Sequence, residues 1–146
     1  MQLCICLQAA GGLTLGIWDV ALYKNKTTEF LSGLEGMHSC LKMLHWSTTN
    51  HSQHLLCDDI DGSVLEYEDR IAECIMGRLN TRFGIGDLKC LLPEAKTLDS
   101  LINELLSDVI SFKKETEDDI LNSGLINILD EFISDINKWN YLKTLS

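Results

Sequence analysis

Residues 44–73, LHWSTTNHSQHLLCDDIDGSVLEYEDRIAE, contain the end of one helical pattern, a polar turn and the start of a longer helical pattern. Apolar residues recur there at steps of three and four, as they do on the buried face of an α-helix. Three histidines and seven carboxylates lie among them, while Arg70 is the only Lys or Arg in the stretch. The stretch therefore predicts a long helix with one apolar face and an unusual density of potential metal ligands on another.

The whole chain has the same helical character. Its 146 residues are enough for one domain with a core of its own, and it has a single proline and almost no β-strand alternation. We expect helices over about residues 27–46, 52–79, 95–115 and 121–142, with Pro93 suited to a first helical turn and room for a short extra helix around 88–91. Long helices with short connections are typical of an antiparallel bundle, so the predicted fold class is an all-α antiparallel four-helix bundle.

The first 26 residues differ in composition from the rest. They begin with the apolar run MQLCICLQAAGGLTLGIWDVAL, which lacks the basic start of a signal peptide. Gly11, Gly16 and Asp19 interrupt this run well short of a membrane span, which needs about 20 apolar residues. We therefore expect an apolar leader over residues 1–26, a bundle domain over residues 27–146 and no membrane-spanning helix.

Charge and cysteine usage narrow the class of partner. Lys and Arg total 12 against 22 Asp and Glu, so the net charge of −10 would repel phosphate backbones and favours cations over DNA. Six cysteines lie at positions 4, 6, 40, 57, 74 and 90 without a C-x-x-C pair, which argues against zinc-ribbon and thioredoxin motifs. This cysteine usage predicts a reducing, cytoplasmic setting.

The potential ligands share one face of the helix predicted over residues 52–79. With His54 at zero on a helical wheel of about 100° per residue, Asp58, Asp69 and Glu73 fall at about 40°, 60° and 100°. The core stripe lies between about 200° and 300°. Its members are Leu56, Ile60, Val64, Tyr67, Ile71, Cys74 and Ile75. A second apolar set lies beside the ligands: Leu55, Leu65, Ala72 and Met76. A helix with two apolar sides packs against something on both, and we expect a partner subunit as the second body.

Distance along the helix decides how the ligands could act together. His54 and Asp58 are one turn apart, as are Asp69 and Glu73, but eleven residues, about 16 Å, separate the two pairs. Two copies packed antiparallel about a two-fold axis would bring the first pair of one chain to the second pair of the other, which gives two equivalent intersubunit sites. His45 can reach His54 across the polar turn, and such imidazoles and carboxylates suit Fe(II), Mn(II) or Zn(II).

These residues resemble the ferroxidase signature of the Dps family, the mini-ferritins named as DNA-binding proteins from starved cells. Each element of the family pattern has its counterpart here: His45-Trp46, His54, Asp58, Asp69 and Glu73. The carboxyl-terminal stretch INKWNYLKTL is also similar to the last helix of the family. The resemblance covers residues 27–144.

The resemblance implies a ferritin-like bundle with ferroxidase activity. His45, His54 and Asp58 of one subunit and Asp69 and Glu73 of its two-fold mate would form each metal site. It further implies a hollow dodecameric shell built from two-fold dimers, which oxidises Fe(II) with hydrogen peroxide in preference to oxygen and stores the ferric mineral.

Three features depart from the family. The turn between His45 and His54 is shorter than usual, which could displace His45. The Lys/Arg-rich tail of the family has no counterpart, so DNA binding is not implied. The apolar leader is atypical.

Other interpretations stay open at this point. The same ligands could bind Zn(II) in an assembly without redox activity, and a helical interaction module without a metal could also have this pattern. Glu35-x-x-His38 is the ligand pair of intrachain di-iron bundles, but it occurs once, and a hydrogen-bonded helix histidine is the simpler interpretation. We expect Trp46 to anchor a helix end. The side chains expected to be solvated are His51, Asp59, Asp61, Glu66 and Glu68.

Overall fold

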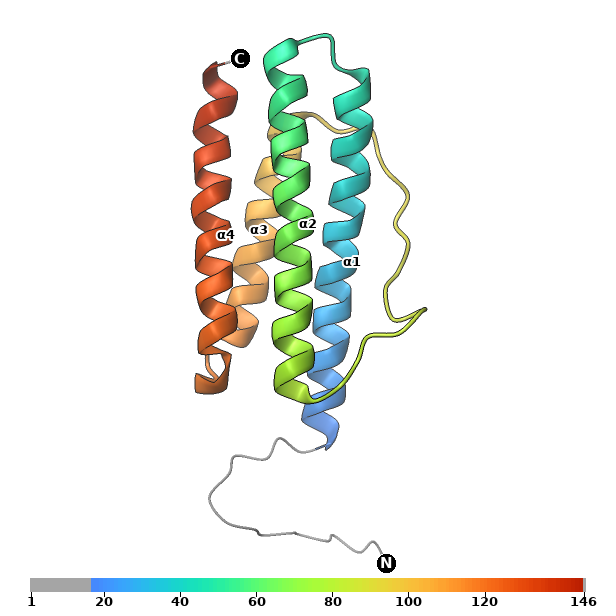
Figure 1. Ribbon diagram of the computed structural model, residues 1–146, viewed down its shortest axis with the longest axis vertical. Helices are drawn as coiled ribbons and strands as arrows, with labels where there is room; N and C mark the ends of the chain where they lie inside the picture. Colours follow the sequence, from blue (N-terminus) through green and yellow to red (C-terminus); the bar gives the residue numbers. More distant parts are fainter. Residues whose placement is uncertain (1–16, 146) are drawn as a thin grey trace, which may run out of the picture.

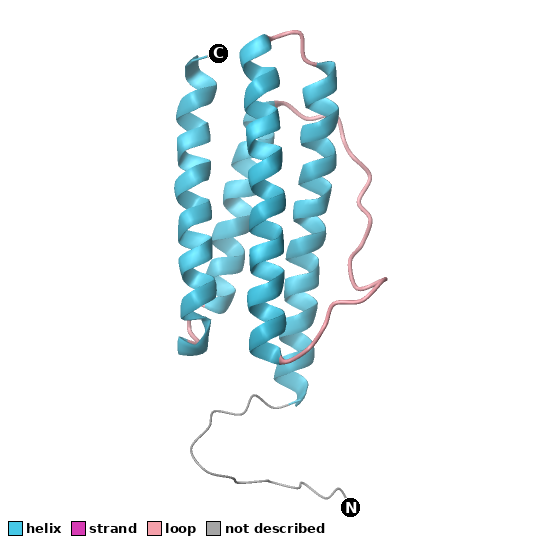
Figure 2. Cartoon of the chain, viewed as in Figure 1, coloured by secondary structure: helices cyan, strands magenta, loops and turns pink. Residues whose placement is uncertain are grey.

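The computed structural model describes residues 17–145, which form four α-helices and two short 3-10 turns. The helices are α1 (Ile17–Ser47), α2 (His51–Leu79), α3 (Leu98–Thr116) and α4 (Ser123–Leu142), with η1 (Ile120–Asn122) before α4 and η2 (Lys143–Leu145) after it. No strand occurs in this part of the chain (Figure 2). The prediction of an all-α four-helix bundle is confirmed.

One long connection determines the topology. Helices α1 and α4 run in one direction along the bundle, and α2 and α3 run in the other (Figure 1). Because α1 and α4 each pack against both α2 and α3, neighbouring helices are antiparallel. The connection from α2 to α3, residues 80–97, returns along the length of the bundle past α1 (Figure 1).

Side chains from all four helices fill one core. On α2 the predicted stripe is buried, with Cys74 packed against it: Leu56, Ile60, Val64, Tyr67, Ile71 and Ile75. Phe30 stacks on Phe112 with ring centroids 4.2 Å apart, and Tyr67 stacks on Phe132 at 4.1 Å. Each such pair contributes about 0.5–1.5 kcal/mol beyond simple burial. The predicted core stripe is confirmed, so α2 turns the opposite side outward.

Two asparagines define the ends of α2. The side chain of Asn50 accepts a hydrogen bond from the Gln53 N–H (3.0 Å), which satisfies a donor that the helix itself cannot pair. Asn80 ends the helix in the left-handed conformation, with φ of 48° and its N–H bonded to the Met76 carbonyl. The residues that flank α2 therefore define both of its boundaries.

The first helix begins at Ile17, earlier than the predicted start near residue 27. Thr27 and Thr28 resemble N-cap residues, but both hydroxyls donate to carbonyl groups inside the helix, those of Tyr23 and Asn25 (2.9 Å each). Residues 17–26 of the predicted leader therefore form the first turns of α1, and residues 1–16 lie outside the described residues. Of the helices in residues 17–145, none combines the length and apolarity needed to cross a membrane.

The predicted extra helix around 88–91 is wrong. Residues 88–97 are not helical, Pro93 lies in this loop rather than in a first helical turn, and α3 begins only at Leu98. The physical reason is the distance that the loop must span. Because α2 and α3 run in the same direction, residues 80–97 must return from one end of the bundle to the other. Extended backbone covers about 3.3 Å per residue, whereas a helix covers about 1.5 Å.

The crossover loop is held against α1. The Lys89 N–H donates to the Ser32 hydroxyl (2.8 Å), and Leu91 packs over Gly36. A Cβ atom at Gly36 would lie only 3.1 Å from the Leu91 side chain, so glycine permits this close approach. The outer side of α1 is therefore partly covered by the loop.

Candidate metal centre

His45 and His54 meet at the end of the bundle where α1 turns into α2. Their rings are stacked, with centroids 3.8 Å apart and an angle of 25° between the planes. The turn between the helices is closed by a hydrogen bond from the Thr48 hydroxyl to the Gln53 side-chain oxygen. The short turn therefore does not separate the two histidines, and their predicted proximity is confirmed.

Reciprocal hydrogen bonds orient both rings. His45 Nδ1 lies 3.1 Å from the His54 carbonyl oxygen, and His54 Nδ1 lies 2.9 Å from the His45 carbonyl oxygen. Because a carbonyl oxygen can only accept, each Nδ1 carries the hydrogen, and the lone pair of the neutral ring is on Nε2. A backbone carbonyl bonded to one ring nitrogen is a common way of orienting a metal-binding imidazole. Within residues 17–145 neither Nε2 atom takes part in a hydrogen bond, so each ring presents an unshared lone pair.

The carboxylates predicted as ligands lie on the outer face of α2. Asp58, one turn after His54, is exposed, and so are Asp69 and Glu73 further along the helix. Within residues 17–145 of a single chain, no group of three or more His, Cys, Asp or Glu side chains is arranged to hold a metal ion. The described chain thus brings His45 and His54 together and leaves the three carboxylates facing outward.

The same outer face also exposes apolar side chains. Leu55 is 55% exposed and Leu65 is 40% exposed. A Cβ atom added at Gly62, which lies between the two ligand pairs, would meet nothing within 4 Å. The first half of the second apolar side of α2 is therefore uncovered within the described chain, whereas Ala72 and Met76 further along the helix are half-buried.

Trp46 does not anchor a helix end as expected. Its side chain is 67% exposed, although its neighbour His45 is half-buried. The physical reason is that Trp46 lies off the apolar stripe that α1 turns toward the core. Trp46 instead adds to the apolar surface near the histidine pair.

Two carboxylates that were expected to be solvated are buried. Asp61 is 8% exposed and Glu68 is 9% exposed. At about 340° and 320° on the wheel, they lie between the core stripe and the ligand face, on the edge that α1 covers. The Asp61 carboxylate lies 2.6 Å from His38 Nδ1 and 4.0 Å from Lys42 Nζ. The interpretation of His38 as a hydrogen-bonded helix histidine is confirmed. The remaining side chains expected to be solvated are exposed: His51, Asp59 and Glu66.

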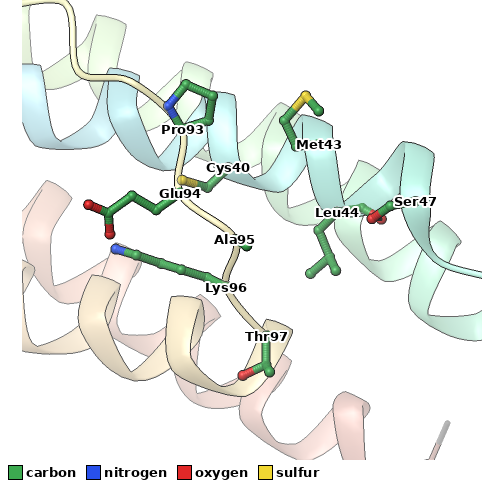
Figure 3. Close-up of a pocket in the computed structure, with 9 residues that line it drawn as sticks. All are labelled: Cys40, Met43, Leu44, Ser47, Pro93, Glu94, Ala95, Lys96 and Thr97. Carbon is green, nitrogen blue, oxygen red and sulfur yellow. Dashed lines mark hydrogen bonds between the residues drawn. The ribbon is translucent and has the colours of Figure 1, made fainter.

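A cavity of about 470 Å³ lies between α1 and the end of the crossover loop (Figure 3). Cys40 and Met43 of α1 line it on one side, and Pro93 and Lys96 of the loop line it on the other. Neither histidine of the stacked pair contributes to its wall. This cavity therefore results from the packing of the loop and is separate from the histidine pair.

The histidine pair and the outer face of α2 can supply part of a coordination shell. Two oriented imidazoles, with a carboxylate one turn from His54, suit a transition-metal ion whose remaining ligands come from outside the chain. No family model, no curated protein and no solved structure matches the chain. Its function is therefore inferred from the bundle and from the residues described above.

Proposed function

We propose that the protein is a Dps-like mini-ferritin, which oxidises Fe(II) at sites between subunits and stores ferric mineral. Each site would combine His45, His54 and Asp58 of one subunit with Asp69 and Glu73 of its mate. The observation that carries this proposal is the stacked histidine pair, in which both Nδ1 atoms bond to backbone carbonyl groups at the open face of α2. Such oriented imidazoles next to carboxylates suit iron redox chemistry.

The connectivity of the bundle supports a ferritin-like fold. Ferritin-like bundles join four helices with one long crossover, whereas simple up-and-down bundles have short loops throughout. Here residues 80–97 form such a crossover, and α2 and α3 run in the same direction (Figure 1). The ligand face of α2 then points away from the core, where a second subunit can reach it.

A two-fold axis that crosses α2 aligns the two copies of the helix so that both ligand pairs meet in a single register. If His54 faces Glu73 of the mate, the numbers of facing residues add up to 127, and Asp58 then faces Asp69 in the same register. This register also places Gly62 opposite Leu65 of the mate, so an exposed leucine meets a position with open space. We propose this antiparallel pair as the unit from which a dodecameric shell is built.

Iron is the substrate of the proposed reaction, and hydrogen peroxide, or oxygen less readily, is the oxidant. Two Fe(II) ions each give one electron to hydrogen peroxide, whose O–O bond breaks, and two protons complete two water molecules. Ionised carboxylates stabilise Fe(III) more than Fe(II), which favours loss of the electron. The reaction consumes both reagents of hydroxyl-radical formation, so iron storage and defence against oxidative stress would be coupled.

The net charge and the free thiols support the proposed partners and the proposed cytoplasmic location. The net charge of −10 disfavours binding to a phosphate backbone, so the proposal includes no strong DNA binding. The cysteines of the described chain are free thiols, which fits a cytoplasmic setting: Cys40, Cys57, Cys74 and Cys90. The same surface charge would attract Fe(II) to the assembly.

The oriented histidine pair also favours a second candidate, a non-redox assembly that binds Zn(II) at the same interface. Zn(II) takes imidazole and carboxylate ligands in a tetrahedral shell, and two fixed Nε2 atoms would serve it equally well. The two candidates differ in electron transfer, because Zn(II) has no redox chemistry.

Iron oxidation by the parent protein and by Asp58→Ala tests the proposal. Fe(II) is loaded without oxygen, a pulse of hydrogen peroxide is added, and ferric absorbance is followed. The parent should form soluble ferric iron rapidly, and Asp58→Ala should slow this at least about tenfold because a metal ligand is lost. Asp59→Ala, which changes the exposed neighbour of Asp58, should behave like the parent.

Equal, slow oxidation in the parent and in Asp58→Ala would contradict the proposal. Tight Zn(II) binding by the parent without any ferric signal above buffer would favour the second candidate.

A further inference from the structure

The first part of the crossover loop, residues 82–89, presents an apolar side chain to solvent. This segment, the loop tip, lies where the loop projects away from α1 (Figure 1). Ile85 is fully exposed there, between Gly84 and Gly86. An isoleucine in this position buries no surface against its own chain, so only a second molecule can remove it from water.

The turn that carries Ile85 is fixed by hydrogen bonds and by an ion pair. The Asp87 N–H donates to the Gly84 carbonyl oxygen (3.0 Å), and the Asp87 carboxylate accepts from the Gly84 N–H (2.6 Å). Gly86 has a φ of 93°, which glycine adopts readily. Lys24 of α1 pairs with the Asp87 carboxylate at 3.1 Å. Because the turn is already ordered, little conformational entropy is lost when a partner covers Ile85.

The loop tip is basic in a chain that is acidic as a whole. Arg82 and Lys89 are exposed on either side of the turn. Asp87 is the single carboxylate in the sequence of the loop tip, and Lys24 neutralises it. The whole chain has a net charge of −10. An acidic surface therefore complements the loop tip.

A groove of the opposite charge lies between α1, residues 90–97 and α3. It comprises the cavity of about 470 Å³ described above and a neighbouring cavity of about 490 Å³, which share Cys40, Glu94 and Lys96. Three carboxylates line this acidic groove: Glu94, Glu104 and Asp108. Lys96 lies among them and is bound to Glu104 (2.6 Å), so carboxylates outnumber the cation in this wall.

Part of the acidic groove is apolar and open to solvent. Met43, in the wall of the first cavity, is 48% exposed, and Leu92, in the wall of the second, is 86% exposed. Met43 and Leu44 lie at one end of the first cavity, and Glu94 and Lys96 lie at the other (Figure 3). The groove thus combines apolar and acidic sections, as the loop tip combines an apolar side chain with basic ones.

We propose that the loop tip of one chain docks in the acidic groove of a second copy. Ile85 enters the apolar section, and the basic side chains of the loop tip lie beside the carboxylates. The two surfaces differ, so the contact is heterologous and forms a ring when its rotation closes. It uses neither the histidine pair nor the outer face of α2, so it can coexist with the two-fold pair. A shell built from two-fold dimers needs such a second contact, and this role in a shell rests on the proposed function.

Sedimentation velocity of the parent and of Ile85→Asp tests the contact. The parent should sediment as a species larger than a dimer. Ile85→Asp should weaken association beyond the dimer at least about tenfold, because it removes the apolar anchor and adds a negative charge opposite carboxylates. Because Ile85 is fully exposed, the variant should keep the thermal unfolding of the parent. Leu121→Asp, which changes an exposed apolar residue of η1, should assemble like the parent.

Charge reversal supplies a second readout, which loss of folding would not reproduce. Arg82→Glu and Glu94→Lys should each weaken the association. The variant with both changes should recover part of the loss, because opposite charges meet again. Lys114→Glu, which changes an exposed lysine of α3, should have no effect.

A parent no larger than a dimer would overturn the proposal and leave the acidic groove open to a different partner. Ile85→Asp with the mass of the parent would also overturn it, as would simple addition of the two losses in Arg82→Glu/Glu94→Lys. Iron oxidation is not measured in these experiments, so failure of the parent to oxidise iron would leave their expected results unchanged.

Discussion

The carboxylates on two neighbouring strips of α2 differ in their exposure to solvent. Asp58, Asp69 and Glu73 lie on the outer strip and are exposed, whereas Asp61 and Glu68 lie on the strip that α1 covers and are buried. As little as about 60° of rotation around the helix separates the two strips. Residues on the buried strip contact other residues of the same chain. The outer strip exposes potential ligands and apolar side chains that a second subunit can contact. The position of the neighbouring helix therefore decides what a carboxylate on α2 does.

Loss of Asp61 should have the largest effect on stability. Asp61→Ala would leave His38 without its partner at a largely buried position, so we expect the free energy of unfolding to fall by about 2–3 kcal/mol. Asp59→Ala, at the exposed position two residues away, should change it by less than about 0.5 kcal/mol. Urea unfolding monitored by circular dichroism measures both. Similar small changes in the two variants would remove the distinction between the strips.

Glu68→Gln should stabilise the metal-free protein in a pH-dependent way. Burial raises the pKa of Glu68 from an ordinary 4.5 to about 7, so between these values the folded chain holds a proton that the unfolded chain has lost. Stability therefore falls as pH rises through this window, and glutamine avoids that loss because it cannot ionise. Its advantage over the parent should grow from near zero at the acidic end to about 2 kcal/mol above it.

Urea unfolding across this pH window, with a chelator present, measures the effect. Glu66→Gln should show no such trend, because Glu66 is exposed. A stability difference that does not vary with pH would mean that burial does not raise the pKa of Glu68.

Added bulk on the outer strip should be harmful only where a second subunit packs against it. A Cβ atom at Gly62 or at Gly77 meets nothing within 4 Å, so leucine at either position should stabilise an isolated chain by up to about 1 kcal/mol. In the proposed pair Gly62 faces Leu65 of the mate, so Gly62→Leu should dissociate the assembly and Gly77→Leu should not. Size-exclusion chromatography with light scattering measures this difference. An unchanged mass for Gly62→Leu would exclude the proposed register.

The sequence was sufficient for features that depend on local spacing. The 3.6-residue period predicts the core stripe of α2, and the polar turn predicts that His45 and His54 lie close together. Asp61 and Glu68 lie next to that stripe on the wheel, which is a signal that they could be buried. Which edge of the stripe becomes covered depends on the packing of α1, and the pattern of α2 alone does not contain that information.

Features set by distant parts of the chain were harder to predict. Thr27 has the sequence pattern of an N-cap, and only the turn of helix before it shows that its hydroxyl bonds within α1. Residues 88–91 are apolar enough for a short helix, but the direction of α3 requires an extended path. The intersubunit site stays a prediction, because its second half belongs to another chain.

Mixing two variants tests most directly whether two chains share each metal site, as we propose. One variant, His54→Ala/Asp58→Ala, lacks the first half of the site, and the other, Asp69→Ala/Glu73→Ala, lacks the second. Each alone should oxidise Fe(II) no faster than buffer after a hydrogen peroxide pulse. Refolded together in equal amounts, about half of the dimers would contain one chain of each kind, and each mixed dimer would keep one intact site of its two.

We therefore expect about a quarter of the parent activity to return in the mixture. No recovery in a mixture whose mixed dimers are verified by native mass spectrometry would contradict a site shared between chains.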